Sequence, residues 1–493
     1  MKPTPLAAFF ITILASLIML LPGPGVCQTS QEAHVSGSPN PVGSGARALG
    51  MGGAFIGVAD DATAASWNPG GLIQLETPEM SIVGSFNQLY EDRHFDQNPG
   101  ASGKYGLSLR NLNYLSAACP FQLLRKNMIV SLNYQTLYNY NKRHKYNYQY
   151  NNHVSSHSDL GPVIIDTATD TGGARLTKYD SDGYLKALSP AIAIQVTPSL
   201  SFGITLNYYH PKLGSKWDTS YFDTLNGTLD LEVSTSVGGN PPVTSHSTYA
   251  VSWKTWYHDE YRFKTSLNPF GFSKTSYNFG FLWNLNRYLT LGGVYKTPFT
   301  AKVAYKETFQ SEEYMENVDD PDDATSTISP YTVIADEHQE IDMPASYGLG
   351  LACRFSDQFS LALDIYRTDW QDFVLRQASG REVSLITGRD KDTADTKPTH
   401  QVRLGGEYLF MLKNKYIVPV RAGLFYDPEP TADEPDDFYG FSLGGGIANG
   451  PVVFDLAYQF RWGNNVHEMR LGNEIITQDV TQHTVYASLI YHF

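Results

Sequence analysis

The chain lacks the features that mark helical membrane proteins, disulfide-rich secreted proteins and nucleic-acid-binding proteins. Beyond residue 21 it has no run of about 18 apolar residues, which excludes a membrane protein built from helices. Only Cys119 and Cys353 follow residue 27, too few for a disulfide framework, and we expect both to be packing residues. The formal net charge of -14 argues against a nucleic-acid partner.

Signals of catalysis and of cofactor binding are also missing. The 13 histidines are scattered, and no metal-binding spacing such as H-E-x-x-H occurs. Gly50-Met51-Gly52-Gly53 fails as a phosphate loop, because no strand precedes it and no lysine accompanies it. A lipase would need a nucleophile, a base and an orienting partner on adjacent strands, and no such grouping stands out. The sequence therefore predicts no enzyme, no cofactor and no metal site.

The N-terminus has the pattern of an export signal. Lys2 precedes an apolar run from Leu6 to Leu21, and Pro22-Gly23-Pro24-Gly25 then breaks any helix. Gly25 and Cys27 are small enough for cleavage before Gln28, so residues 1–27 are predicted to be a signal peptide. Lipid modification of Cys27 is an alternative, but the residues before it match a lipoprotein signal poorly.

A two-residue alternation of large apolar and small or polar residues recurs along the chain. It is clear in 200–208, 359–365 and 452–460, each close to the ten residues that a tilted strand needs to cross a bilayer. With 13% aromatic residues and a mean hydropathy of -0.29, the composition fits strands that expose every second residue to lipid. These features predict a transmembrane β-barrel.

The spacing of turns predicts the number of strands. Short connections are expected near 120–126, 197–198, 284–286, 356–357, 413–415 and 449–450. Long polar connections are expected near 91–110, 150–183, 210–273, 308–342, 370–398, 427–436 and 463–482. The two kinds alternate strictly, as periplasmic turns and external loops do in outer-membrane barrels. We therefore predict a 14-stranded antiparallel barrel over residues 78–493, with both barrel ends on the periplasmic side.

The last strand ends in an exposed aromatic residue. From Thr484 to Phe493, the apolar residues share one face with Phe493 and the polar ones lie on the other. A closed barrel pairs such a strand with its first strand. We interpret Phe493 as a signal to the barrel assembly machinery of the outer membrane.

Two aromatic clusters are assigned from the same pattern. Counting 249–265 as a strand would break the alternation of turns, so Trp253, Trp256 and Tyr257 are placed in an external loop. There they would either form an apolar surface that captures ligand or pack over the barrel mouth. Five tyrosines continue the lipid-facing parity of Val130 and Leu132 and are expected in the aromatic girdle: Tyr138, Tyr140, Tyr146, Tyr148 and Tyr150.

Residues before the first strand differ in composition. Gly43–Leu75 is rich in glycine and alanine and has no strand alternation. Irregular backbone is tolerated at membrane depth where protein surrounds it, so residues 28–77 are predicted to form a hatch inside the barrel. Asn68-Pro69-Gly70-Gly71 would form a tight turn within it. Asp60 and Asp61 are expected to cap helices or to pair with the lumen wall rather than to bind a cation.

This segment, GARALGMGGAFIGVADDATAASWNPGGL, resembles the hatch of the FadL/TodX family of outer-membrane transporters for long-chain fatty acids and hydrocarbons. Asn68-Pro69-Gly70 matches that family's Asn-Pro-Ala motif, with Gly70 in place of alanine. Further similarity lies in residues 289–298, 343–347 and 366–370. The resemblance implies a barrel plugged by a hatch, in which hydrophobic ligand is caught by external loops and leaves through an opening in the wall.

Function follows from the resemblance and the barrel together. The expected activity is uptake of hydrophobic small molecules by passive diffusion, in contact with outer-membrane lipid. A fatty acid would need a partner for its carboxylate, and Lys296, Arg403 and Arg421 point inward by parity. The alternative is that they pair with Asp364, Glu407 and Asp455 to hold the hatch. A secretion-associated barrel without small-molecule transport is the other function considered.

Overall fold

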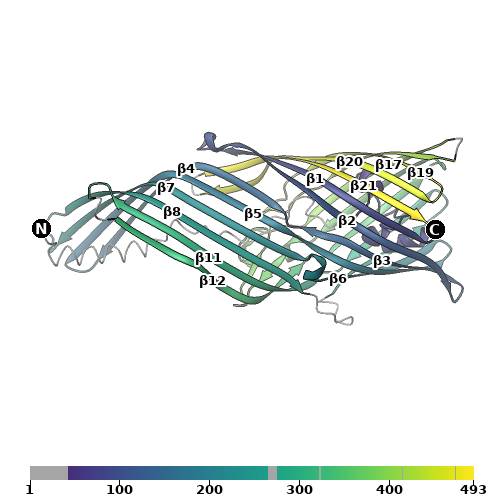
Figure 1. Cartoon of the computed structure of the whole chain (residues 1–493), viewed down its shortest axis with the longest axis horizontal. Helices are drawn as coiled ribbons and strands as arrows, with labels where there is room; N and C mark the ends of the chain where they lie inside the picture. The colour runs from purple at the N-terminus through teal and green to yellow at the C-terminus, as the bar shows by residue number, and fades with distance from the viewer. Residues whose placement is uncertain (1–42, 265–274, 321–323, 413–414, 472–473) are drawn as a thin grey trace.

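The computed structural model describes residues 43–264, 275–320, 324–412, 415–471 and 474–493. Its main body is a closed antiparallel β-barrel, and a second sheet projects from one end of it (Figure 1). None of the helices in these residues is long and apolar enough to cross a membrane. The predicted signal peptide, residues 1–27, lies outside the described residues.

Fourteen strands form the barrel wall, as predicted. In order around the wall they are β1 (Glu79–Phe95), β2 (Gly103–Leu123), β3 (Lys126–Asn139), the second half of β5 (Val163–Thr197), β6 (Leu200–Tyr209), β9 (Ser276–Asn284), β10 (Leu289–Lys296), β13 (Ser346–Arg354), β14 (Phe359–Thr368), β17 (Thr399–Met411), β18 (Ile417–Tyr426), β19 (Tyr439–Asn449), β20 (Val452–Leu471) and β21 (Glu474–His492). Pairing of β1 with β21, from Glu79–His492 to Phe95–Ile476, closes the barrel.

The six short turns lie where the sequence placed them. They join β2 to β3, β5 to β6, β9 to β10, β13 to β14, β17 to β18 and β19 to β20. Lys413 and Asn414 of the fifth turn lie outside the described residues. All six are at the end that also holds the C-terminus (Figure 1). In outer-membrane barrels the short turns face the periplasm, which places the projecting sheet outside the cell.

The projecting sheet consists of three hairpins, each of which connects two neighbouring barrel strands. Its strands are β4 (Lys142–Asp159), the first half of β5, β7 (Lys216–Val237), β8 (Val243–Lys264), β11 (Phe299–Asn317) and β12 (Ala324–Met343). At 35 residues, β5 is about 115 Å long at ~3.3 Å per residue and belongs to both sheets. Pro298 and Pro344 stand where β10 passes into β11 and β12 into β13, because proline cannot donate to the ladder.

The placement of Trp253, Trp256 and Tyr257 in a loop is wrong. They lie in β8, which pairs with β7 and β11 along its length. It adds no fifteenth barrel strand, because its partners are in the projecting sheet. The alternation of short and long connections was therefore correct, but most of the long connections are themselves β-hairpins.

The girdle assignment is wrong for Tyr138 and Tyr140. A register shift between Thr136 and Tyr138 inserts one extra residue into β3. Because strand side chains alternate, this shift turns both tyrosines inward. They are buried in the core at the barrel mouth. Tyr148 also packs inward, against Phe95.

Residues 43–77, called the lumen segment here, lie inside the barrel. They form α2 (Ala46–Gly50), α3 (Ala64–Trp67) and the 3₁₀-helix η1 (Pro69–Gln74). Their small side chains are buried with inward residues of the wall, such as Ala191 and Ala362. The backbone of the segment packs directly on the wall. If Gly423 carried a Cβ atom, that atom would lie only 2.2 Å from the Gly52 nitrogen, closer than real Cβ contacts allow. The glycine-rich composition thus allows close packing of the segment on the strands.

Further short elements lie in the external connections. They are η2 (Pro99–Ala101), η3 (Pro211–Leu213), η5 (Trp370–Asp372), η6 (Lys391–Thr393), β15 (Val374–Arg376) and β16 (Glu382–Ser384). The strand β15 pairs with the base of β12. This brings Trp370, Phe373 and Leu375 into the core at the barrel mouth.

Candidate transport path

An aromatic face runs down the projecting sheet toward the barrel. On β8, Trp253, Tyr257 and Tyr261 share one face because they are spaced by even numbers of residues. Each ring meets others from neighbouring strands. The Tyr257 ring centre lies 4.8 Å from that of Phe309, and the Tyr261 ring centre lies 4.4 Å from that of Trp217. Polar groups lie between these rings on the same face: Asp223 pairs with Arg175 at 2.8 Å, and Asp259 accepts from the Tyr305 hydroxyl at 3.1 Å. The face is therefore a series of aromatic patches separated by polar rows.

The same face continues into the barrel mouth. Trp217 stacks on Tyr140 at 5.3 Å between ring centres, and Tyr140 stacks on Phe263 at 5.8 Å. These rings belong to a buried apolar cluster that also contains Tyr209, Phe299 and Trp370. Apolar side chains thus extend from the external sheet to the interior of the barrel.

The three residues predicted to capture ligand do not lie on one surface. Trp253 packs against the apolar cluster of Leu229 and Val251, on the face that leads to the barrel. Trp256 lies on the opposite face, where its ring centre is 5.2 Å from that of Phe222. Only Trp253 and Tyr257 can therefore belong to a common path.

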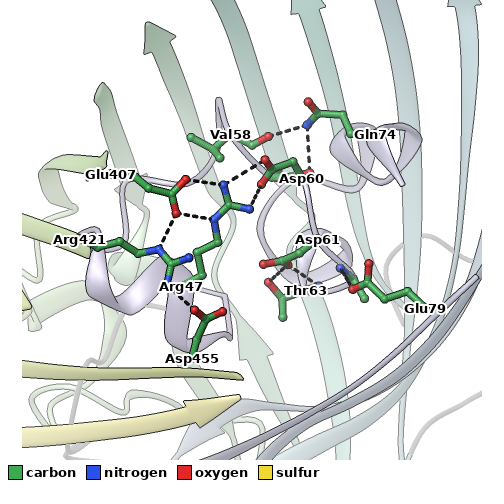
Figure 2. Close-up of polar contacts among 12 residues, drawn as sticks. Arg47, Val58, Asp60, Asp61, Thr63, Gln74, Glu79, Glu407, Arg421 and Asp455 are labelled. Atoms are coloured by element: carbon green, nitrogen blue, oxygen red, sulfur yellow. Dashed lines mark hydrogen bonds and ion pairs between the residues drawn. The ribbon is translucent and has the colours of Figure 1, made fainter. Parts of the chain in front are cut away.

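A network of ion pairs holds the lumen segment to the wall. Arg47 in α2 pairs with Asp60 at 2.7 Å and with Glu407 of β17 at 2.8 Å. Arg421 of β18 bonds the same Glu407 at 2.6 Å and Asp455 of β20 at 2.6 Å (Figure 2). Two guanidinium groups thus share one buried carboxylate, with planar geometry suited to paired bonds.

Asp60 and Asp61 both make polar contacts within the lumen segment. Asp61 accepts from the backbone nitrogen of Thr63 at 2.8 Å, and Asp60 binds Arg47 (Figure 2). On the wall, Glu79 accepts from the Ala62 nitrogen at 2.9 Å. Asp60 thus forms a salt bridge within the segment, where a salt bridge to the lumen wall or a helix cap was expected, and Asp61 holds the turn at Thr63.

Asn68 joins the motif Asn68-Pro69-Gly70 to the wall. Its side-chain oxygen accepts from the Gly70 nitrogen at 3.1 Å, which starts the 3₁₀-helix. Its side-chain nitrogen donates to the carbonyl oxygens of Ile56 at 2.9 Å and Phe281 at 2.8 Å. The amide therefore ties two turns of the lumen segment to β9.

A cavity of about 130 Å³ lies beside the lumen segment on its external side. It is bounded by Gly43 and Trp67 of that segment, by Asn111 and Asn113 of β2, and by Thr136 of β3. The Asn113 side-chain oxygen is buried and has no hydrogen-bond partner among the residues that the structure describes. Such an atom is unusual in a protein interior and marks a place where a ligand or water can bind.

The wall beside this cavity has a seam. Backbone pairing of β2 with β3 runs from Leu123–Lys126 to Tyr114–Gln135, and within the described residues it goes no further outward. Asn113 is an extra residue in β2 at that point, opposite the Val83–Gly84 step of β1. Beyond it, the strands are bridged by a side-chain hydrogen bond of 2.9 Å from Asn111 to Thr136.

Comparison with known proteins identifies a family that matches this chain. Residues 42–467 match the family model described as outer membrane protein transport protein (OMPP1/FadL/TodX). The chain belongs to this family. Its members are outer-membrane transporters of hydrophobic compounds and are not enzymes.

Solved structures similar to this FadL/TodX family member include a Pseudomonas aeruginosa FadL homologue, with 16% identity, a TM-score of 0.48 and coverage of 92% of this chain and 98% of that one. The Pseudomonas putida toluene transporter TodX has 14% identity, a TM-score of 0.46 and the same coverages. The Ralstonia pickettii toluene transporter TbuX has 13% identity and a TM-score of 0.42, over 92% and 99% of the two chains. A comparison with curated proteins found no match.

Within this family member, the three cationic candidates have different surroundings. Arg421 is engaged by Glu407 and Asp455, the pairing expected as the alternative to ligand binding. Arg403 borders the cavity, donates to the Gly52 carbonyl at 2.9 Å and pairs with Asp427 at 3.3 Å. Lys296 points inward and borders a small polar space, with its Nζ 5.8 Å from the centre of the Tyr366 ring.

Sequence reasoning missed three parts of this path. Arg47 was not singled out, although it is the one basic residue in the glycine-rich segment 43–75 and could have been paired with the lumen acids. The seam between β2 and β3 had no signal, because an extra residue in a strand disturbs the alternation only locally. The core made by Trp370, Phe373 and Leu375 lies in a stretch predicted as a loop.

Proposed function

We propose that the chain takes up hydrophobic compounds from outside the cell by passive diffusion. Ligand binds the aromatic face of β7, β8 and β11, moves along it to the barrel mouth, and enters the cavity beside the lumen segment. It leaves sideways through the seam between β2 and β3. The observation that carries this proposal is the succession of aromatic and apolar patches from Trp253 to Tyr140, ending above a cavity that borders the seam.

We infer that residues 28–77 act as a hatch that stays in place during transport. The support is the network of Arg47, Glu407 and Arg421, which would have to break for the segment to leave. Separating a buried ion pair leaves an uncompensated charge and costs about 3–5 kcal/mol. A hatch that stays fixed favours a sideways exit, since the straight route through the barrel remains blocked.

The exit must widen for a ligand to pass. A cavity of about 130 Å³ holds roughly four water molecules at ~30 Å³ each, far less than a long acyl chain occupies. Side-chain hydrogen bonds bridge the seam at Asn111, and these can open without breaking a backbone ladder. The seam is therefore the part of the wall near the cavity that opens at least cost.

We propose that the preferred ligands carry a carboxylate. Polar side chains of Gln135, Asn207 and Asn278 line the space beside Lys296. These amides hydrogen-bond one another, with Gln135 donating to Asn207 at 2.9 Å and Asn207 to Asn278 at 3.3 Å. A carboxylate can exchange hydrogen bonds with such a polar network, whereas a hydrocarbon makes none with it. Lys296 supplies the positive charge, and Arg403 is a second partner nearer the hatch.

The test of the activity is uptake by cells that express or lack the protein. Labelled fatty acid, its matching alkane and toluene are compared, with Lys296→Met as a variant. Expression should speed uptake, and the variant should slow the acid by about tenfold while changing the alkane little, since a charge-assisted hydrogen bond contributes about 1.5–3 kcal/mol. Equal uptake with and without the protein would remove the transporter proposal and favour a secretion-associated barrel.

The exit route has its own test. Asn111→Cys with Thr136→Cys, in a background with Cys119→Ser and Cys353→Ser, places two thiols across the seam where the wild-type side chains are hydrogen-bonded. Oxidation should stop uptake and reduction should restore it. Asn127→Cys with Gln195→Cys, across the paired region of β3 and β5 near the periplasmic end, is the control. Undiminished uptake through a fully cross-linked seam would exclude this exit.

A further inference from the structure

A wide hollow lies on the lipid-facing side of the wall. Its volume is about 870 Å³, within the ~300–1,000 Å³ typical of ligand pockets. Its floor crosses β6, β9, β10, β13 and β14, and its lining is almost entirely aromatic and aliphatic. It is separate from the transport path, because the exposed side chains that line it, such as Phe279, Tyr295 and Ile365, point away from the lumen.

Gly293 creates the hollow. In the row that runs across three strands from Phe281 to Leu349, it is the residue between two large outward side chains. A Cβ at Gly293 would lie 2.2 Å from the ring of Phe281, so the ring leans over the position that a side chain would fill. The neighbouring outward residues are large and exposed, with Leu349 59% and Ile365 54% accessible. Because the Phe281 ring lies over Gly293, it does not stand out from the wall like its neighbours, and a depression with apolar walls remains.

The lumen segment keeps this part of the wall in place. Asn68 donates to the Phe281 carbonyl oxygen at 2.8 Å, and a Cβ at Gly70 would lie 2.7 Å from the Phe281 Cα. Backbone therefore packs directly behind the hollow. A site backed in this way is preformed, and binding costs little ordering of the protein.

A cationic group stands at the external end of the hollow. Tyr295, Tyr347, Arg367 and His400 form one outward row across β10, β13, β14 and β17, each paired in register with the next. Arg367 and His400 both line the hollow. The Arg367 Nη1 lies 3.4 Å from the His400 Nε2, and its Nε donates to Asp369 at 2.8 Å. The terminal nitrogens of the guanidinium keep N–H groups for a further anion.

This row marks the external edge of the apolar band. Below it on β14 come Ile365 and Leu363, both exposed to lipid, and above it the chain enters the external connection at Asp369. Aromatic side chains flank the apolar band of outer-membrane barrels at the level of the lipid headgroups. Arg367 and His400 therefore lie where the phosphate of a lipid in the external leaflet would be.

We propose that the hollow is a binding site for a phosphate-bearing lipid of the external leaflet. One acyl chain fills the depression over Gly293, and the phosphate binds Arg367 and His400. Arginine binds phosphate through paired N–H bonds, and the charge of Arg367 favours an anionic headgroup over one that also carries an ammonium group. His400 accepts from the Arg367 Nη1 through its Nε2 and offers its other ring nitrogen to the phosphate. The site is a resident-lipid site on the outer wall and does not depend on the proposed transport activity.

The test is native mass spectrometry of the full mature chain in detergent micelles. Phosphatidylglycerol and phosphatidylcholine with identical acyl chains are supplied together, and the retained lipid is counted. We expect one tightly held phosphatidylglycerol, preferred about tenfold over phosphatidylcholine. The double variant Arg367→Gln with His400→Gln should reduce this preference to about one, since it removes the phosphate-binding groups and leaves the apolar floor of the hollow in place.

A second variant tests the hollow itself. Gly293→Leu should abolish retention of both lipids, because its side chain displaces the Phe281 ring into the depression. Gly445→Leu is the matched control, since a Cβ there meets only the Pro419 oxygen at 3.6 Å, away from the hollow. Heat-modifiable migration confirms that each variant is folded. Equal retention of the two lipids by the parent, an unchanged preference in the charge variant, or occupation by a second copy of the chain would overturn the proposal.

Discussion

Arg47 is the residue through which the lumen segment and the barrel wall depend on each other. It reaches Asp60 in its own segment and Glu407 on β17, while Arg421 holds the other side of Glu407 (Figure 2). Loss of Arg47 leaves Asp60 without this partner and Glu407 with one cation in place of two. The network therefore couples the position of the segment to two neighbouring strands.

We predict that Arg47→Gln loosens the lumen segment without unfolding the barrel. Removing one partner of a buried pair costs about 3–5 kcal/mol, and Arg47 is a fifth exposed, so about 2–3 kcal/mol is expected. Amide hydrogen exchange in residues 43–77 should accelerate at least tenfold, and planar-bilayer conductance should rise. Arg354→Gln, at an exposed position near a periplasmic turn, should change neither. Unaltered exchange in the Arg47 variant would contradict this role of the network.

Glu429 plays a comparable part in the external connection between β18 and β19. It pairs with Arg461 at 2.7 Å and with His467 at 2.6 Å. Burial alone would raise the pKa of Glu429, but the charges of Arg461 and His467 outweigh it and lower the pKa to about 2. The folded pKa lies below the unfolded one, so the carboxylate stabilises the fold above the unfolded pKa.

This stabilisation should decline in acid. A pKa lowered to about 2 corresponds to roughly 3 kcal/mol at pH 7, and less than half of it remains at pH 3, where an unfolded glutamate is protonated. Glu429→Gln should therefore destabilise the protein more at pH 7 than at pH 3. The measurement is the urea midpoint of both proteins in micelles at the two pH values. A difference that grows on acidification would contradict the sign of the shift.

At the scale of elements, β8 presents two chemically similar faces with different surroundings. Trp253 and Tyr257 lie on the face that leads into the barrel, and Trp256 and Phe222 lie on the opposite one. Composition cannot separate these residues, because all are aromatic and adjacent in sequence. Pairing with β7 and β11 assigns each to its face.

We predict that only one face serves uptake. Trp253→Ser with Tyr257→Ser should slow uptake of fatty acid and alkane alike, since burying an apolar ligand against a ring contributes roughly 25 cal/mol per Å². Trp256→Ser with Phe222→Ser removes the same number of rings from the opposite face and should leave the rate close to that of the parent. Initial rates at matched surface expression give the comparison. Equal slowing by both double variants would indicate general damage to the sheet.

At the scale of the whole molecule, closure depends on the last strand. Pairing of β21 with β1 covers seventeen register positions, from Glu79–His492 to Phe95–Ile476. Phe493 follows it, 64% exposed, with its ring 4.8 Å from that of Tyr491 and its nitrogen bonded to the Pro78 carbonyl. The residue is thus accessible at the periplasmic rim and contributes little to the core.

We predict that Phe493→Asp, or deletion of Phe493, reduces assembly in the outer membrane severalfold. Because the ring is exposed, the folded barrel itself should lose little stability. Heat-modifiable barrel in membrane fractions reports assembly, and refolding of purified protein into micelles reports stability. Phe493→Trp should behave as the parent. Normal membrane levels of the Asp variant would show that the terminal aromatic is no assembly signal.

The sequence by itself determined the barrel, its fourteen strands and the position of the short turns, because alternation with a period of two and turn residues are local properties of the chain. It also determined that Arg403 and Arg421 face inward, since parity carries from Val402 and Val420 to their neighbours. The family followed from the segment 45–72, which no strand pattern explains.

Only the tertiary structure decided which residues each inward or outward side chain contacts. Whether a cation faces ligand or an acid depends on strands far apart in sequence, as Arg421 with Asp455 illustrates. One extra residue at Leu137 turned two tyrosines from lipid to core, and one glycine at 293 made a hollow on the outer wall. Long polar connections read as loops became β-hairpins because three of them lie side by side and satisfy one another's backbone hydrogen bonds.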